Sequence, residues 1–198
     1  MRIKSNWFKP GREHTPAELA GALSFVIYRI ADDALKNTRK AKFEVAVGAQ
    51  YFSFLTEFLL FLIQVADRIA YRRLSEDGRF AFTSELANRI AETHAENESR
   101  LLGGDPAECK HRFIEQLNQR AGEYAEFGYG DSGPDFSFTR YLAFCMDEVV
   151  DEKDNGWIID QMMSIAAPEA VDMVEKTFRN LLESEERPTR RRTSASGD

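Results

Sequence analysis

The chain has 198 residues, of which 43% are hydrophobic and 30% charged, so it can bury a core of its own and lacks the composition of a disordered protein. Its net charge of -7 argues against a nucleic-acid-binding domain, which would present a concentrated basic face to the phosphates. Fifteen Phe against six Pro, with few alternating Val or Ile runs, favour helix packing over sheet. We therefore expect an all-α, single-domain bundle of six or seven helices around a long, mostly buried central helix.

The first helix is predicted from Thr15 to about Thr38. Thr15 is placed as the N-cap, Pro16 occupies the first helical position, and Glu18 is spaced to close a capping box. Residues 1–14 are then an N-terminal arm, in which basic residues are followed by no apolar stretch of the kind found in secretory signals.

The long central helix is predicted from about Phe43 to Leu74, and its segment 45–66 contains Glu57 as the only formal charge. Steps of three and four residues place the polar side chains on one stripe, leaving most of the circumference apolar. The stripe consists of Gln50, Ser53, Glu57, Gln64, Asp67 and Tyr71. It is either a thin solvent edge or a polar seam inside the bundle. The polar run 75–78 is interpreted as the turn that ends this helix.

A membrane span is the alternative interpretation of segment 45–66, because about 20 apolar residues can cross a bilayer. Glu57 near its middle would cost about 2.5 kcal/mol or more on insertion, and basic residues flank both ends, so no orientation is specified. We therefore expect a soluble protein that does not associate with a membrane.

The remaining helices are predicted over 83–102, from the N-cap Asp105 to about Phe127, from Asp135 or Ser137 to Val149, over 157–165, and over 168–182. The inner face of the third helix is predicted to carry Leu86, Ile90, His94 and Leu101. Residues 15–183 thus form the helical domain. Residues 184–198 lack apolar periodicity and are expected to be a disordered, charged tail.

The segment from Gly130 to Pro134, GDSGP, resembles the GDSGGP signature around the nucleophile of trypsin-like serine proteases, with one Gly missing. That chemistry needs an imidazole base and a carboxylate held on a double β-barrel, and no strand-rich pattern precedes the segment. We interpret it as a turn and expect Ser132 not to be a nucleophile.

Two further patterns suggest metal binding, and both are incomplete. The loop that starts at Asp151 is similar to an EF-hand loop, but Lys153 and Met162 stand where oxygen ligands belong. Glu108 and His111 have the Glu-x-x-His spacing of di-iron bundles, but in a single copy, and Glu108 also fits a capping box. We predict no metal ligand, no catalytic residue and no cofactor.

His94 falls on the apolar face of its helix, and two interpretations stay open: a structural histidine, in the core or at the solvent boundary, or a histidine bonded to Glu57 or Gln64 on the polar stripe. The candidate ligand seam consists of Gln50, Glu57, Gln64, Asp67 and His94.

Two isolated cysteines, Cys109 and Cys145, are interpreted as free, buried thiols of a cytoplasmic protein.

Core-type residues are plentiful and catalytic groups are few, which favours a soluble, non-enzymatic interaction or regulatory module. We expect it to form a homodimer through an apolar helix face near Phe54, Phe58 and Phe61, with a protein partner as a further expectation. The alternative is a bundle that binds a ligand or a metal through the seam around Glu57, Gln64, Asp67 and His94. This alternative includes an enzyme.

Overall fold

Helix α1 (Pro16–Lys40) begins, in the computed structural model, at the capping box predicted from the sequence. The Thr15 hydroxyl accepts a hydrogen bond from the backbone N–H of Glu18 at 3.2 Å, and the Thr15 N–H donates to the Glu18 carboxylate at 3.0 Å. The structure describes residues 14–183. The predicted tail 184–198, and the predicted arm apart from His14, therefore lie outside the described residues.

Helices make up 81% of the structure and strands very little, so the predicted all-α, single-domain class is confirmed. The elements after α1 are α2 (Ala49–Arg73), α3 (Glu76–Leu102), α4 (Pro106–Tyr124), β1 (Tyr129–Gly130), β2 (Gly133–Pro134), α5 (Phe136–Asp147), a 3₁₀ turn (Glu152–Asp154), α6 (Trp157–Gln161), a π-helical turn (Met162–Ala166) and α7 (Ala167–Glu183).

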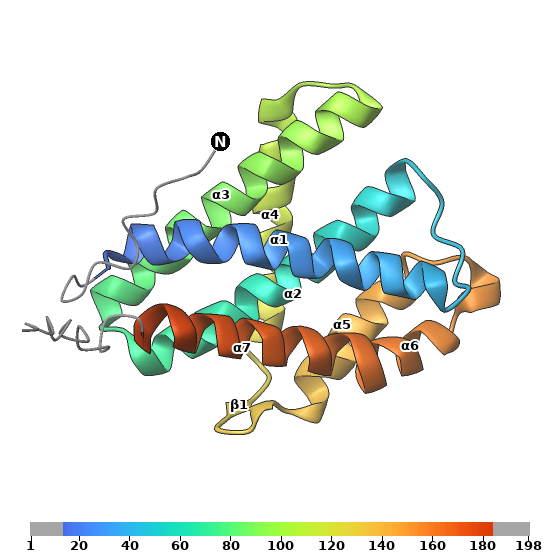
Figure 1. Ribbon diagram of the computed structural model, residues 1–198. Helices are drawn as coiled ribbons and strands as arrows, with labels where there is room; N and C mark the ends of the chain where they lie inside the picture. Colours follow the sequence, from blue (N-terminus) through green and yellow to red (C-terminus); the bar gives the residue numbers. More distant parts are fainter. Residues whose placement is uncertain (1–13, 184–198) are drawn as a thin grey trace, which may run out of the picture.

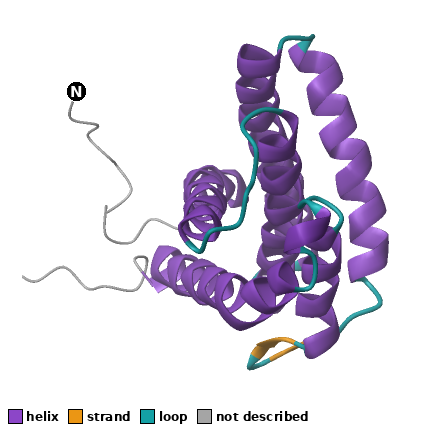
Figure 2. Ribbon diagram, turned by 90° about the vertical axis from the view of Figure 1, so that its right-hand side faces the viewer, coloured by secondary structure: helices purple, strands orange, loops and turns teal. Residues whose placement is uncertain are grey.

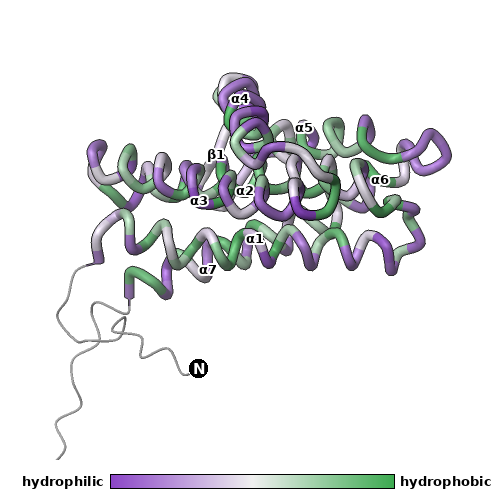
Figure 3. Tube along the Cα trace, turned by 90° about the horizontal axis from the view of Figure 1, so that it is seen from above, coloured by the Kyte–Doolittle hydropathy of each residue, from purple (hydrophilic) through white to green (hydrophobic). Residues whose placement is uncertain are grey.

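The helices are arranged in layers, with α2 passing between them. Helices α1 and α7 run side by side along one face of the molecule (Figure 1). Seen from above, α4 lies on the opposite face, and α2, α3, α5 and α6 lie between α4 and the α1–α7 pair (Figure 3). Helix α2 contacts helices of both outer layers, which explains why its sequence is apolar around most of its circumference.

The apolar side chains of α2 fill the core of this single chain. Phe54, Phe58 and Phe61 are all fully buried, with ring contacts between Phe54 and Phe58 and between Phe58 and Phe61. The prediction that these three residues form a dimer interface is therefore wrong, because helices of the same chain already cover them. By length and composition α2 could cross a membrane, but 72% of its most apolar stretch is buried inside the structure.

The start of α2 differs from the prediction, whereas its end at Arg73 lies within one residue of the predicted Leu74. The helix begins at Ala49 and not near Phe43, because Gly48 precedes it at a φ of 114°, a conformation that ends regular helix on its N-terminal side. At the other end, Ser75 does not close α2 but starts α3, since its hydroxyl accepts a hydrogen bond from the N–H of Gly78 at 3.2 Å. Leu101, predicted on the inner face of this helix, is 70% exposed.

The GDSGP segment forms a short hairpin at one end of the molecule (Figure 2). Gly130 pairs with Gly133 across the two strands, and the exposed Ser132 lies in the turn between them. Gly133 has a φ of 96°, which requires glycine's freedom. The turn was predicted, whereas the pairing of the flanking residues into strands was not.

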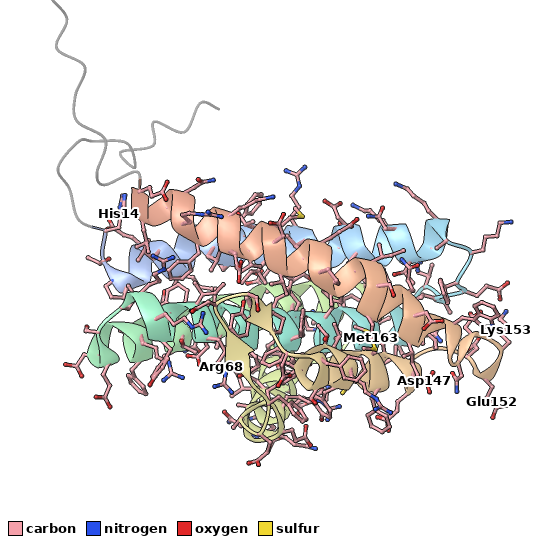
Figure 4. The ribbon with its side chains drawn as sticks, turned by 90° about the horizontal axis from the view of Figure 1, so that it is seen from below. His14, Arg68, Asp147, Glu152, Lys153 and Met163 are labelled. Atoms are coloured by element: carbon pink, nitrogen blue, oxygen red, sulfur yellow. The ribbon has the colours of Figure 1, made fainter. Side chains whose placement is uncertain are left out.

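The acidic loop between α5 and α6 is tied to the segment before α2. The N–H of Glu44 donates to the Asp154 carboxylate at 3.1 Å, and Lys153 forms an ion pair with Glu44. The N–H of Gly156 donates to Asp147 at 2.9 Å. Figure 4 shows Asp147, Glu152 and Lys153 together at this end of the bundle. The carboxylates of Asp147 and Asp154 therefore accept backbone hydrogen bonds that fix the loop.

Candidate functional site

The polar stripe of α2 does not act as one seam, and Gln50 at its start has a structural role. The Gln50 side chain accepts a hydrogen bond from the N–H of Ala46 at 2.5 Å. Its amide donates to the carbonyl of Val149 at 3.0 Å and to Asp151 at 3.2 Å. Gln50 thus joins the start of α2 to the segment that follows α5.

Glu57 forms a buried ion pair with α4. Its carboxylate accepts hydrogen bonds from Arg120 Nη2 at 2.8 Å and Nε at 3.0 Å, and from Gln116 Nε2 at 2.6 Å. The Arg120 guanidinium also contacts Glu123 and the hydroxyl of Tyr141. A charge this deeply buried persists only when it is paired, and Arg120 supplies that pairing.

Asp67 and Gln64 belong to a different region of the molecule. The Asp67 carboxylate accepts hydrogen bonds from Arg79 Nε at 2.9 Å and from the Thr83 hydroxyl at 2.7 Å, both on α3. Gln64 is buried and, with Asp67, lines a groove of about 670 Å³ between α2, α3 and α4. The structure therefore does not bring these two residues together with His94, and the predicted single seam is wrong in this part.

His94 points inward, as its position on the apolar face of α3 predicts, and it is only 1% exposed. Its partner is Thr56, whose hydroxyl lies 2.9 Å from Nε2, so the alternative of a bond to Glu57 or Gln64 is not realised. The other ring nitrogen, Nδ1, is buried and has no hydrogen-bond partner among the described residues. Phe52 and Phe113 pack beside the ring, with centroids 5.6 Å and 5.2 Å away.

Burial, followed by the positive charge of Arg112, lowers the pKa of His94 from 6.5 to about 4. The ring is therefore neutral at pH 7. A neutral imidazole carries one N–H and one lone pair, and Thr56 engages only one of these two nitrogens. The unpaired nitrogen is a polar atom held in an apolar setting, which costs roughly 1–3 kcal/mol when it has no partner.

His94 lines a cavity of about 380 Å³ that is enclosed by α2, α3, α4 and α5. The buried floor contains Phe52, Thr56, Glu57, His94, Cys109, Phe113 and Cys145. The exposed rim contains Ala49, Ser53, Arg112 and Glu148. Gln116, Glu98 and Val149, which are partly buried, complete the wall. The lining mixes aromatic and thiol side chains with polar and charged groups, and a cavity of this volume is typical of small-ligand sites.

Several residues of this cavity were not identified from the sequence. Arg112 donates to Glu98 at 2.6 Å and lies 3.5 Å from the sulfur of Cys109. Cys109 and Cys145 are buried, as expected, but their common location was not predicted. The i and i+3 spacing of Cys109 and Arg112 on one helix was the available signal, and it does not reveal which helix lies opposite.

The thiol of Cys145 is not activated in this cavity. Burial, together with the negative charge of Glu57, raises its pKa to about 12. Within residues 14–183, no group of three or more His, Cys, Asp or Glu side chains is placed to hold a metal ion. His111 is exposed on α4 and pairs with Glu115 at 3.2 Å, on the surface and away from the His94 cavity.

Comparison with known proteins adds no relative from which a role could be transferred. No family model matches the chain, and neither a curated protein nor a solved structure matches it.

Proposed function

We propose that this protein is a helical ligand-binding module and that its binding site is the cavity containing His94. The observation that carries the proposal is a cavity of about 380 Å³ whose lining combines the buried polar side chains of Thr56, Glu57 and His94 with Phe52 and Phe113. Polar groups placed among apolar side chains in such a cavity fix the orientation of a bound molecule. The exposed rim gives such a molecule a path to the buried floor.

The same groups favour binding over catalysis. A general base works best when its pKa lies near the working pH, and the pKa of His94, at about 4, is far below it. Glu57 is neutralised by Arg120, and Cys145, with its raised pKa, is protonated at pH 7. The cavity therefore holds groups that can donate, accept and pack, without an activated nucleophile or base.

The test is a screen of small polar fragments, followed by NMR of the histidine ring nitrogens. A ligand at this site should shift the ring signals of His94 and leave those of His111, which is 75% exposed on the surface, unchanged. His94→Gln should abolish binding, whereas His111→Gln should keep it. Fragments that bind without affecting His94, or a complete lack of binding by all fragment classes, would contradict the proposal.

A second candidate function, self-association, is favoured by the groove between α2, α3 and α4. Its wall includes the apolar residues Ile63, Ile114 and Leu117, and Phe80 at its edge is 75% exposed. We propose a second copy of the chain as the occupant, since it could cover the exposed Phe80 and the apolar side chains at the edge of this groove.

Light scattering at micromolar concentration tests this dimer. The wild type should have the mass of two chains, and Phe80→Asp should release monomers that keep their helical circular dichroism. Phe25→Asp on α1, where the side chain is 73% exposed and lies outside the groove, is the matched control and should stay dimeric. A monomeric wild type would reject self-association.

A further inference from the structure

The charges around the His94 cavity are mainly negative. Three carboxylates line it, those of Glu57, Glu98 and Glu148, against the single guanidinium of Arg112. Glu148 lies on the exposed rim and, in the described part of the chain, forms no ion pair. The Arg112 guanidinium, which is paired with Glu98, lies on the same rim.

The nearby positive groups are already occupied by partners within the protein. Arg112 donates to Glu98 at 2.6 Å, and Arg120 donates to both oxygens of Glu57. His94 is neutral at pH 7 and adds no positive charge. An anionic ligand would have to displace one of these carboxylates, whereas a cation would leave both ion pairs intact.

The floor also contains groups that suit a cation. Phe52 and Phe113 flank His94, and aromatic ring faces attract ammonium groups. The Glu57 carboxylate accepts three hydrogen bonds and has room for a fourth.

We infer that the ligand of this cavity is a small organic cation, an alkylammonium ion, an inference that rests on the proposed ligand-binding function. The ammonium group lies at the floor beside the His94 ring, where it faces the Glu57 carboxylate. Its alkyl chain packs against Phe52 and Phe113. Glu148 attracts the cation to the rim and opposes the entry of anions.

The experiment compares three probes with the same alkyl chain and different charge: n-butylammonium, butyrate and n-butanol. Each is titrated into the full-length protein by calorimetry and by NMR of the histidine ring nitrogens. Butylammonium should bind most tightly and shift the His94 ring signal. Its affinity should fall as salt concentration rises, because part of the attraction comes from exposed charges.

Two rim variants test the electrostatic part of the inference without disturbing the core. Glu148→Gln removes a negative charge, and Ser53→Lys adds a positive one at an exposed position of α2. Each should weaken butylammonium binding roughly fivefold to tenfold, as expected for one exposed charge near a bound ion. Glu92→Gln is the matched control, because Glu92 is exposed on α3 and does not line the cavity, and it should leave the affinity unchanged.

The outcomes separate this inference from the proposed function. If butyrate or butanol binds at His94 as tightly as butylammonium, the cavity is a ligand site but the cation inference is wrong. Equal affinity for butylammonium in wild type and in both rim variants would also overturn it. If none of the three probes and no fragment affects His94, both the inference and the proposed function fail.

Discussion

At the scale of single residues, His94 shows what burial does to a titratable group. Periodicity on α3 predicted that its side chain points inward, because that prediction depends only on helix geometry. Its partner was not predictable, since the position of Thr56 opposite His94 depends on how α2 and α3 pack. Neither the unpaired Nδ1 nor the cavity beside it can be read from residue types and spacing.

The lowered pKa of His94 predicts a loss of stability at acid pH. The unfolded chain binds a proton at this residue near pH 6.5, and the folded protein does so only near pH 4. The unfolded state therefore holds more protons in this window, and the free energy of unfolding falls as pH drops from 6.5 to 4. At pH 4, His94 lowers the free energy of unfolding by roughly 3 kcal/mol relative to neutral pH.

Urea denaturation at pH 7, 5.5 and 4 measures this effect. The carboxylates also titrate in this range, so the informative quantity is the difference in unfolding free energy between wild type and His94→Gln. That difference should decrease as pH falls through the window. His111→Gln should show the pH dependence of the wild type. A difference for His94→Gln that stays constant with pH would mean that burial does not keep this ring neutral.

At the scale of elements, helix ends could be predicted where the capping residues had only one interpretation. Thr15, Pro16 and Glu18 formed the expected capping box, because all its bonds are made within four residues. The segment from Ser75 to Gly78 contained two signals, a Ser that can cap and a Gly that can end a helix. The structure uses the Ser as the N-cap of α3 and accommodates Gly78 in the first turn.

Contacts between elements were beyond prediction for a different reason. The stripe on α2 indicated which side of the helix is polar, but not that α4 would supply Arg120 to Glu57 while α3 supplied Arg79 to Asp67. These partners lie far away in sequence, and helix periodicity gives no information about crossing angles. The polar side chains of the stripe therefore bind partners on different helices and do not form one seam.

Two glycines should respond in opposite ways to substitution by alanine. Gly122 lies within α4 and a Cβ there would meet no atom within 4 Å, so Gly122→Ala should stabilise the protein by about 0.5–1 kcal/mol. Gly133 in the hairpin has a φ of 96°, so Gly133→Ala should destabilise it by about 1 kcal/mol or more. Thermal unfolding of both variants checks this, and a stabilised Gly133→Ala would contradict the description of the hairpin.

At the scale of the whole molecule, composition was enough to predict the all-α class, and the pattern of segment 45–66 indicated only that an apolar helix needs cover. It was not enough to predict what encloses it. Phe58 was expected at a dimer interface, because the other helices looked too modest to cover α2, yet its side chain is fully buried within one chain. The layered packing of α2 between α1–α7 and α4 removes the need for a second copy at this position (Figure 3).

Truncation of Phe58 should therefore act on folding and not on assembly. Phe58→Ala removes a fully buried ring and should lower the free energy of unfolding by about 3–5 kcal/mol. Phe25→Ala, at a side chain that is 73% exposed, should change it by less than about 0.5 kcal/mol. Denaturant unfolding gives both values. A Phe58→Ala protein with wild-type stability and an altered mass would restore the interface hypothesis.

The position of α2 early in the chain has a consequence for how the protein is made. Helix α2 is covered by α4, α5 and α7, which are all synthesised after it. A ribosome adds roughly 5–20 residues per second, so the apolar surface of α2 stays uncovered for seconds after it leaves the exit tunnel. During that time the nascent chain presents a helix with the length and composition of a membrane span to every factor that recognises such segments. Folding of α2 in the nascent chain therefore depends on a competition in time, between the synthesis of α7 and the capture of α2 by such a factor.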